Sequence, residues 1–579
     1  MLDSDVLIQN DLKIANIFNE YFTNITSKLN IIKWKPDIVC NSIDDIVQKF
    51  SDHPSIQKIE QSFSNGSKFN FSHIHPWDTY QAIMELNPSK STSGSIPTNI
   101  LQKVAKECCI PLTDCFNNCI LDGIFPTELK MANITPVFKS DDSNFKSNYR
   151  PISILPSLSK VFEKLLTNQI NSFFQNKFSS LLCGFRKKYS TQHALLKLLH
   201  KWQSCLDNRG KVGTILMDLS KAFDCLPHDL LLAKLKAYGF TMDSLKLMNS
   251  YLSGRFQRVR IGSAFSKWLE VLLGVPQGSI LGPLLFNIFI NDLFLFLTES
   301  EVCNFADDNT IYSCSPTIEA VICDLEKGLN NSLQWFKANQ LVANAAKFQI
   351  MFLGFYENLS LKIGNILVKP SYWVKLLGVM IDNKLKFDLH INNICKVANY
   401  KVRCLSRIRR LINDRQALRL CNAFILCNFN YCPLIWMYCC KHLNNKINTV
   451  HKRALRAVTG YYTDSFEDLL SSLNETTIHQ RSNVALLTEI HKCFSGTHPD
   501  IVTSLFVPKY MPYSLRNSTL LTLPSTKTIK YGVNSVFFRG NQLWNSLPDR
   551  FKLLNNPATF KKEVTSWVGQ KCKCNLCHT

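Results

Sequence analysis

The chain has 579 residues, of which 46% are hydrophobic and 19% charged, and this balance excludes a largely disordered protein. The length predicts several domains. The formal net charge of +22 predicts a polyanionic partner, either nucleic acid or an acidic membrane surface. The first five residues contain two acids where a secretory signal would be basic. The uncharged stretches 271–291 and 420–440 are interrupted by Gly, Asn or Pro, which argues against membrane-spanning helices. We therefore expect an intracellular protein with no membrane partner.

The pattern of apolar residues divides the chain into four segments. Residues 1–95 show helical spacing and end in polar turn material. From 96 to 385, helical stretches alternate with short β-branched runs, which predicts an α+β domain. Residues 386–460 read as helical and basic, and residues 461–579 as a mixed C-terminal domain with a Cys-rich end.

The first stretch with chemical potential is an apolar run that ends in an acid. Ile215–Met217 is suited to a buried strand, and Asp218 closes it. A helix is predicted to begin near Pro227 and to end before Gly239. An ionised carboxylate at the end of a buried strand is costly unless a cation meets it. Taken alone, such an Asp is as often the N-cap of the following helix.

A loop punctuated by Gly and Pro comes next, from Gly274 to Pro283, and opens an apolar helix through Phe286. Glycines allow a ligand to approach the backbone, and a helix N-terminus favours anions. An ordinary turn before a core helix explains the same pattern equally well.

The third stretch, Glu301–Tyr312, has two apolar arms around an Asp-Asp-Asn centre and predicts a tight β-hairpin with Asp307 and Asp308 at its tip. Asp-Asp pairs also occur at 44–45 and 141–142 in polar surroundings, so the dipeptide itself means little. The apolar hairpin distinguishes Asp307–Asp308, because burying adjacent acids is tolerable when a divalent metal compensates their charge.

Basic residues are concentrated between Lys396 and Arg456, a segment that contains thirteen Lys and Arg residues and only one acid, Asp414. Ordinary soluble surfaces intersperse both signs, so this clustering favours nucleic-acid contact over a solvated surface. The contact residues expected there are Lys396, Arg403, Arg407, Arg409 and Arg410.

Together these stretches predict a site in which Asp218, Asp307 and Asp308 hold two hard cations. Oxygen ligands favour Mg²⁺, with Mn²⁺ as an alternative, and two such ions can clamp the attacking and leaving oxygens of a phosphoryl transfer. The glycine loop would lie beside the substrate, and the basic segment would grip a polyanion.

The order of these motifs resembles the reverse transcriptases of non-LTR (LINE-type) retrotransposons. Further blocks carry the resemblance: Asn148–Ser153 and Gly184–Thr191 resemble fingers motifs, and Leu377–Asp382 resembles the strand at the far edge of the palm. The resemblance is specific over about 139–382. Weaker likeness in the tail, at Leu543–Pro548, points to the Jockey/CR1-like branch. The resemblance as a whole implies a right-hand polymerase, with fingers and a palm built on an antiparallel sheet in 96–385 and a thumb in 386–460.

The resemblance also implies roles for individual residues. Asp218, Asp307 and Asp308 would be metal ligands, and Phe223 a steric gate that rejects the ribose 2′-OH. Lys347 would protonate the leaving pyrophosphate, although Asn344-Ala-Ala-Lys347 departs from the usual Asn-Pro-x-Lys-Thr of the family. A core Phe and a surface Lys are the plainer alternatives for the last two. The other expected nucleotide contacts are Lys139, Arg150, Arg186, Leu219, Gln277 and Gly278.

The implied partners are an RNA template, a DNA primer or target, and deoxynucleoside triphosphates, with action expected in the nucleus and cytoplasm. About 138 residues precede Lys139, too few for the endonuclease such elements usually carry, so we expect a truncated element.

The alternative functions are an inactive or domesticated RNA-binding remnant, an RNA-directed RNA polymerase and a group II intron maturase. The C-terminal Cys572, Cys574 and Cys577 form only a weak zinc pattern.

Overall fold

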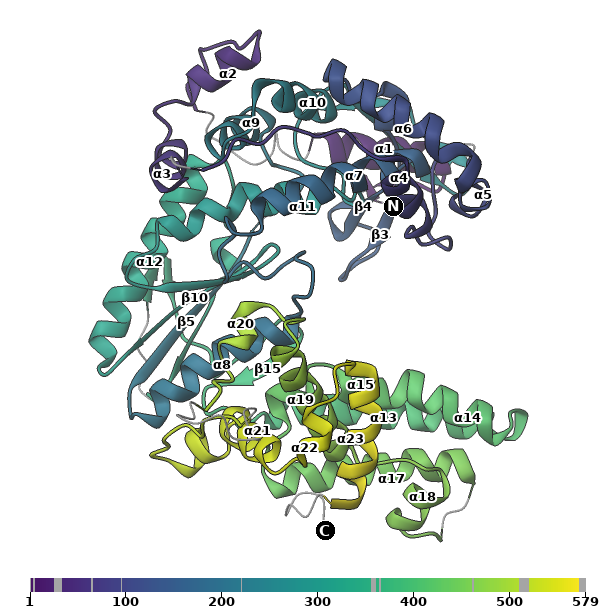
Figure 1. Ribbon diagram of the computed structural model, residues 1–579, viewed down its shortest axis with the longest axis vertical. Coiled ribbons are helices and arrows are strands. Elements are labelled where there is room, and N and C mark those ends of the chain that lie inside the picture. The colour runs from purple at the N-terminus through teal and green to yellow at the C-terminus, as the bar shows by residue number, and fades with distance from the viewer. Residues whose placement is uncertain are drawn as a thin grey trace. The chain divides into compact units, whose positions relative to one another are not determined.

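The computed structural model describes residues 2–3, 6–24, 34–63, 66–94, 96–219, 221–355, 361–363, 366–460, 463–509 and 520–571. The chain folds into two compact units and passes between them more than once. Unit 1 comprises residues 1–185, 218–298 and 330–344, and unit 2 comprises residues 186–217, 299–329 and 345–579. Figure 1 shows the chain coloured along its length.

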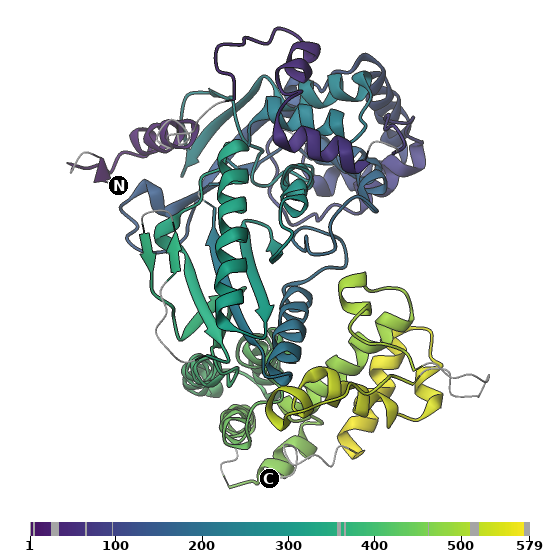
Figure 2. The same ribbon diagram turned by 90° about the vertical axis from the view of Figure 1, so that its left-hand side faces the viewer.

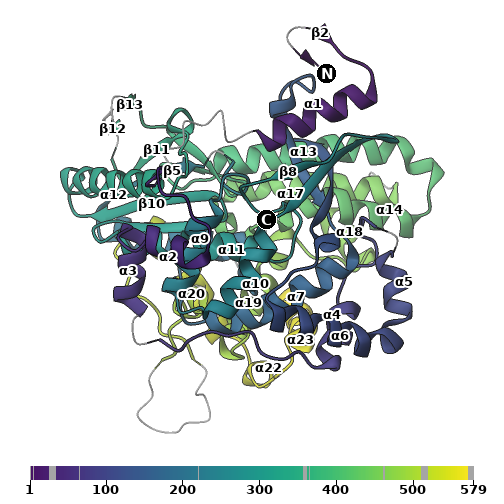
Figure 3. The same cartoon turned by 90° about the horizontal axis from the view of Figure 1, so that it is seen from above.

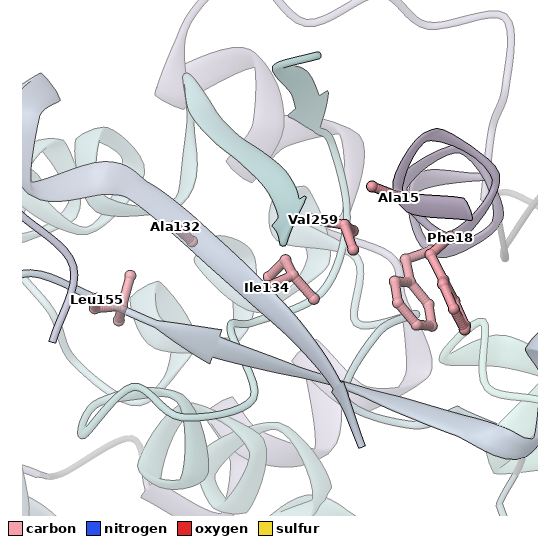
Figure 4. Packing of buried hydrophobic residues seen from close by; sticks show 7 residues of the cluster. Ala15, Phe18, Ala132, Ile134, Leu155 and Val259 are labelled. Atoms are coloured by element: carbon pink, nitrogen blue, oxygen red, sulfur yellow. The ribbon is translucent and has the colours of Figure 1, made fainter. Parts of the chain in front are cut away.

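Unit 1 contains a sheet in the order β4-β3-β6-β7, with β8 also paired to β6. Strands β3 and β6 run parallel, and the other pairs are antiparallel. Helix α1 begins after the N-cap Asn10 and packs on β6. Its Ala15 and Phe18 meet Ile134 and Val259 of the sheet in one buried apolar cluster (Figure 4).

Besides this sheet and α1, unit 1 consists mostly of helices. Its elements are β1 (Leu2–Asp3), β2 (Val6–Leu7), α1 (Asp11–Thr23), α2 (Ile43–Lys49), α3 (Pro54–Phe63), α4 (Pro76–Met84), α5 (Thr98–Lys103), α6 (Ala105–Asp122), β3 (Met131–Phe138), β4 (Tyr149–Ile154), α7 (Ser157–Phe174), α9 (His228–Ala237), α10 (Met242–Leu252), β6 (Arg255–Ile261), β7 (Ala264–Phe265), β8 (Leu269–Val271) and α11 (Gly282–Ile290).

Unit 2 is built on a sheet in the order β11-β5-β10-β9, from β5 (Lys211–Asp218), β9 (Glu301–Phe305), β10 (Asp308–Ser315) and β11 (Gln349–Leu353). The pairs β11–β5 and β9–β10 are antiparallel. Helix α12 (Ile318–Ala338) lies across these strands (Figure 2). The contact is close because Gly213 has no side chain, and a Cβ there would lie 2.5 Å from Leu325.

The rest of unit 2 is mostly helical, and α13 and α17 pack side by side (Figures 1 and 3). Its other elements are α8 (Thr191–Asp207), β12 (Leu361–Ile363), β13 (Ile366–Val368), β14 (Trp373–Leu376), β15 (Val379–Asp382), α13 (Asp388–Ile408), α14 (Asp414–Leu420), α15 (Cys427–Asn430), α16 (Pro433–Trp436), α17 (Lys441–Thr459), α18 (Phe466–Ser472), α19 (Ile478–Phe494), α20 (Asp500–Thr503), α21 (Val536–Asn545), α22 (Asp549–Lys552) and α23 (Pro557–Lys571).

The structure confirms the expected mixture of helices and antiparallel sheet. The helix expected between Pro227 and Gly239 is α9, and the hairpin expected at Glu301–Tyr312 is formed by β9 and β10. One expectation is wrong: β15 forms a two-stranded sheet with β14 and is not the edge of the four-stranded sheet. The chain reverses direction at Leu377–Gly378, where both residues have positive φ, so β15 pairs locally. None of the helices described here has the length and apolar character needed to cross a membrane.

Candidate active site

The hairpin of β9 and β10 carries Asp307 and Asp308 at its turn. Phe305 pairs with Asp308, so Ala306 and Asp307 form a two-residue turn. Ala306 has φ +61°, a conformation that costs an L-residue about 1–2 kcal/mol. Ala306 is buried, Asp307 half-buried and Asp308 exposed, so the turn directs the two carboxylates toward solvent-accessible space.

Two buried asparagine side chains form hydrogen bonds with the backbone of this turn. Asn304 Nδ2 donates to the carbonyl of Ala306 at 2.7 Å and to Asn309 Oδ1 at 3.0 Å. Asn309 Nδ2 donates in turn to the carbonyl of Asp307 at 3.2 Å. Each carbonyl of the turn therefore has a side-chain donor, which offsets the backbone strain at Ala306. Asn304 was not predicted from the sequence, where its signal is a polar residue within an otherwise apolar arm.

Asp218 is the last residue of β5, the strand that lies beside β10 in the sheet. The following Leu219 forms an isolated bridge with Ala343, and the Asp218 carbonyl accepts from the amide of Asn344. Lys347 lies in the short 3-10 helix Ala345–Lys347, just before β11, the other neighbour of β5. The structure thus places Asp218, Asp308 and Lys347 at or next to the ends of three adjacent strands.

Phe223 lies in a turn between β5 and α9 and belongs to an aromatic group in unit 1. Its ring stacks on Phe286 of α11 at a centroid distance of 4.4 Å, and the edge of Phe185 meets it at 5.6 Å. Gly274 packs against the backbone of Phe223, where a Cβ would lie 2.6 Å from the Phe223 carbonyl. The half-buried Phe223 ring is therefore held between the glycine loop and α11.

The loop before α11 is fixed to its surroundings by backbone contacts and buried side chains. Gly278 has φ +133°, and a Cβ there would lie 2.4 Å from the carbonyl of Ser153 in β4. Ser153 donates its amide to the carbonyl of Gln277 at 2.8 Å. Buried Glu163 of α7 accepts from the amides of Ile280 and Leu281 at the start of α11. These contacts explain why glycine is required at 278.

Gln277 and Asp224 line a cavity of about 760 Å³ within unit 1, together with Pro151, Ser153 and Arg255. This volume is in the range of small-molecule sites. Gln277 Nε2 donates to Asp224 Oδ1 at 2.8 Å, while Asp224 Oδ2 is buried with no hydrogen bond within the described chain. Burial raises the pKa of the Asp224 carboxyl to about 6, against the opposing effects of the Gln277 hydrogen bond and of Lys221.

Changing Asp224 to Asn is expected to stabilise the protein at pH 7 and not at pH 4. The pKa of Asp224 is higher in the folded than in the unfolded chain, so the stability that its protonated form contributes is lost as pH rises from about 4 to 6. An amide keeps an acceptor for Gln277 and removes the charge, so we expect a gain of about 1–2 kcal/mol at pH 7. Thermal unfolding of both proteins from pH 4 to 8 measures this difference, and a gain independent of pH would contradict it.

Three cations of unit 1 lie near one another, namely Lys139 after β3, Arg150 on β4 and Lys221 in the turn that follows β5. Burial, and then the charges of Lys139 and Arg150, lower the pKa of Lys221, whereas Asp224 opposes the change. Lys139 and Arg150 are exposed, and the Lys139 amide donates to the Asn148 carbonyl at the loop end of the β3–β4 pair. No role was predicted for Lys221 from the sequence. Arg186 belongs to unit 2, where its guanidinium stacks on Tyr189.

The basic segment forms an exposed face on α13. Lys396, Arg403 and Arg407 are exposed and recur at helical spacing, with exposed Tyr400 between them. Arg410 follows in an exposed 3-10 turn.

Arg409 differs from these four residues because its guanidinium bonds within the protein. It donates to the carbonyls of Val458 and Ile412 and pairs with Asp414. Its contacts therefore join the end of α13 to the end of α17. Cys572, Cys574 and Cys577 lie outside the described residues.

Residues 137–381 match the family model described as "Reverse transcriptase (RNA-dependent DNA polymerase)". The chain is 26% identical over 441 residues to the probable RNA-directed DNA polymerase from transposon X-element of Drosophila melanogaster, a match covering 73% of this chain and 47% of that protein. It is 28% identical to the probable RNA-directed DNA polymerase from transposon BS (65% and 42% covered) and to the RNA-directed DNA polymerase from mobile element jockey (60% and 39%), both of Drosophila melanogaster.

The family match covers nearly the same residues as the motifs that carry the resemblance, and the relatives include the jockey element itself. The comparisons therefore support both the family and the branch predicted from the sequence. The chain spans about half the length of the curated relatives it matches.

Proposed function

We propose, on the premise that this chain belongs to the reverse transcriptases of non-LTR retrotransposons in their Jockey/CR1-like branch, that it is an RNA-directed DNA polymerase. The observation that carries the proposal is the β9–β10 hairpin, which presents Asp307 and Asp308 beside the strand that ends on Asp218, inside the segment matched by the family model. The substrates would be deoxynucleoside triphosphates, an RNA template and a DNA primer, acted on in the nucleus and cytoplasm.

In this proposal the four-stranded sheet of unit 2 is the palm, the β3–β4 pair belongs to the fingers, and α13 to α17 form the thumb. Asp218, Asp307 and Asp308 would hold two divalent ions, Mg²⁺ or Mn²⁺, and the all-oxygen ligand set fits such hard cations. Bound metal would neutralise phosphate charge and lower the pKa of the primer 3′-OH.

The chain's own residues would orient the substrates around that site. Lys139, Arg150 and Lys221 form a cationic group suited to the triphosphate, where they would neutralise charge that develops on the leaving pyrophosphate. Lys347 would supply a proton to that leaving group. Gln277 and Gly278 would border the base pair, and the Leu219 carbonyl would add an oxygen ligand.

Primer extension on poly(rA)/oligo(dT) with dTTP and Mg²⁺ tests the proposal, with Asp307→Ala as the inactive control. The polymerase predicts template-dependent incorporation by the natural chain and none above background by the variant. If both chains bind RNA and neither incorporates dTTP, the protein is an RNA-binding remnant and the proposal fails.

Changing Phe223 to Ala is expected to relax discrimination against ribonucleotides. The ring is held between Phe286 and the glycine loop, so it cannot move aside for a 2′-OH, and its removal opens that space. We expect the ratio of dNTP to rNTP incorporation to fall by about tenfold or more. Single-nucleotide incorporation kinetics measure the ratio, and Phe424→Ala, at an exposed phenylalanine of unit 2, is the matched control. An unchanged ratio would make Phe223 a packing residue.

Arg409 and Arg410 are adjacent, but replacing each with Ala is expected to have a different effect. Arg410 is exposed, so its loss should weaken template binding and reduce the slope of log affinity against log salt by about one. Arg409 bonds to Val458, Ile412 and Asp414, so its loss should lower the melting temperature and leave the slope unchanged. Salt titrations of RNA binding and thermal unfolding separate the two outcomes, and equal salt slopes for both variants would contradict the expectation.

A further inference from the structure

A cluster of two histidines and a glutamate lies within unit 2, among residues to which the polymerase proposal gives no role. His193 comes from the first turn of α8, Glu489 from α19, and His498 from the loop between α19 and α20. Their ligand atoms all lie within 4.8 Å of one another. The side chains of His193, His498 and Glu489 are 6%, 5% and 13% exposed, so the cluster is shielded from bulk water.

Both imidazoles approach the same carboxylate oxygen. Nε2 of His193 lies 3.0 Å from Glu489 Oε2, and Nε2 of His498 lies 2.6 Å from that oxygen. The His498 nitrogen is close enough for a hydrogen bond, yet its direction does not form one, and it has no other hydrogen-bond partner among the described residues. A buried ring nitrogen left in this way is costly unless a further group satisfies it.

A metal ion would resolve this arrangement. Two imidazole nitrogens and one carboxylate oxygen are a ligand set that Zn²⁺ takes, with the ligand atoms about 3.3 Å apart around a tetrahedral ion. The two nitrogen–oxygen separations, 3.0 and 2.6 Å, lie near that value, and all the ligand atoms lie within 4.8 Å of one another, so side-chain rotations would complete the site. Glu489 Oε1 pairs with Lys492 Nζ at 3.0 Å, an outer contact that fixes the carboxylate while Oε2 faces the histidines.

The backbone holds His498 in place over Glu489. After α19, the chain turns at Gly496, which has φ +64°. Thr497 then donates its amide and its hydroxyl to the Lys492 carbonyl. This turn brings the His498 ring edge-on to the His193 ring, at a centroid distance of 4.8 Å. The local turn after α19 therefore places His498 next to both Glu489 and His193.

We propose that His193, Glu489 and His498 form a structural zinc site, with a water molecule in the fourth position, that fastens the chain after α19 to α8. The site is independent of polymerase chemistry, because none of its ligands comes from the carboxylate strands or the glycine loop. His193 and Glu489 are 296 residues apart in the sequence, so no local spacing motif announces the site.

Metal content and thermal unfolding test the site in the full chain. All proteins carry the changes Cys572→Ser, Cys574→Ser and Cys577→Ser, which remove the cysteines of the C-terminal candidate zinc pattern. We expect this parent to retain about one zinc ion per chain by elemental analysis, and chelation to lower its melting temperature. His498→Ala and Glu489→Gln should lose the metal and the response to chelator, whereas His442→Ala, at an exposed histidine of unit 2, should keep both.

A second readout does not depend on how the variants fold. Co²⁺ added to the chelated parent should give the visible absorption of a tetrahedral site, and Zn²⁺ should displace it. A folded parent that holds no zinc and develops no Co²⁺ spectrum overturns the proposal and leaves the cluster as a buried ion pair. Neither result depends on polymerase activity, so the two proposals fail separately.

Discussion

An Asp308→Asn protein is expected to extend primers about 10³-fold or more slowly than the natural chain, because a metal site that loses one of its carboxylates loses several kcal/mol of transition-state stabilisation. Adding Asp218→Asn should reduce the rate little further. Residues that act as a unit are strongly non-additive, and once the metal site has failed, a second ligand has little left to contribute.

Single-turnover primer extension with Mg²⁺ measures both steps, and circular dichroism checks that the variants are folded. Asp44→Asn is the matched control, because Asp44 belongs to another Asp-Asp pair and is exposed in the first turn of α2. Losses that multiply in the double variant would mean that Asp218 and Asp308 act separately, contrary to a shared metal site.

The second large effect is expected on stability, from replacing Asp292 with Ala in unit 1. Lys234 and Asp292 are fully buried and paired at 2.5 Å. Lys234 also donates to the Phe289 carbonyl, and Trp335 Nε1 donates to the second oxygen of Asp292. Removing the acid leaves a buried ammonium without its counter-charge, at a cost of about 3–5 kcal/mol.

Chemical denaturation of the purified chain measures this loss, and the surface pair Lys246–Asp243 provides the control. Both of its side chains are more than half exposed, so Asp243→Ala should shift the midpoint little. The double change Lys234→Met with Asp292→Leu should recover much of the stability, since an apolar pair of similar volume removes both buried charges. Equal effects of Asp292→Ala and Asp243→Ala would contradict the expectation.

The sequence was informative where local chemistry determines structure. The hairpin at 301–315 follows from two apolar arms around a polar turn, and α9 ends where Gly239 supplies positive φ. The match to the family model spans the motifs around Asp218, Gln277 and Asp307. Within such segments, residue type and spacing carry most of the information.

Features that depend on distant partners could not be predicted. The charges of Lys139 and Arg150 help to lower the pKa of Lys221. Both residues are distant from Lys221 in the sequence and come near it only in the folded unit 1. In the sequence, Arg409 resembles its basic neighbours. In the structure it differs from them, because it donates a hydrogen bond to the carbonyl of Val458. The pairing of β15 with β14 was missed for another reason. It is local, across the two-residue turn Leu377–Gly378, and Leu is not among the residues that usually occupy the positive-φ positions of such hairpin turns.

The interleaving of the two units has a consequence during synthesis. Helix α8 buries Leu195, Leu199 and Trp202, and partners of this helix lie in α19 and α20, roughly 300 residues further along the chain. At translation rates of about 5–20 residues per second, an emerging α8 waits roughly 15–60 s for those partners. During that time it presents an apolar stripe to the cytosol, so the nascent chain is expected to depend on chaperones most strongly between the synthesis of α8 and that of α20.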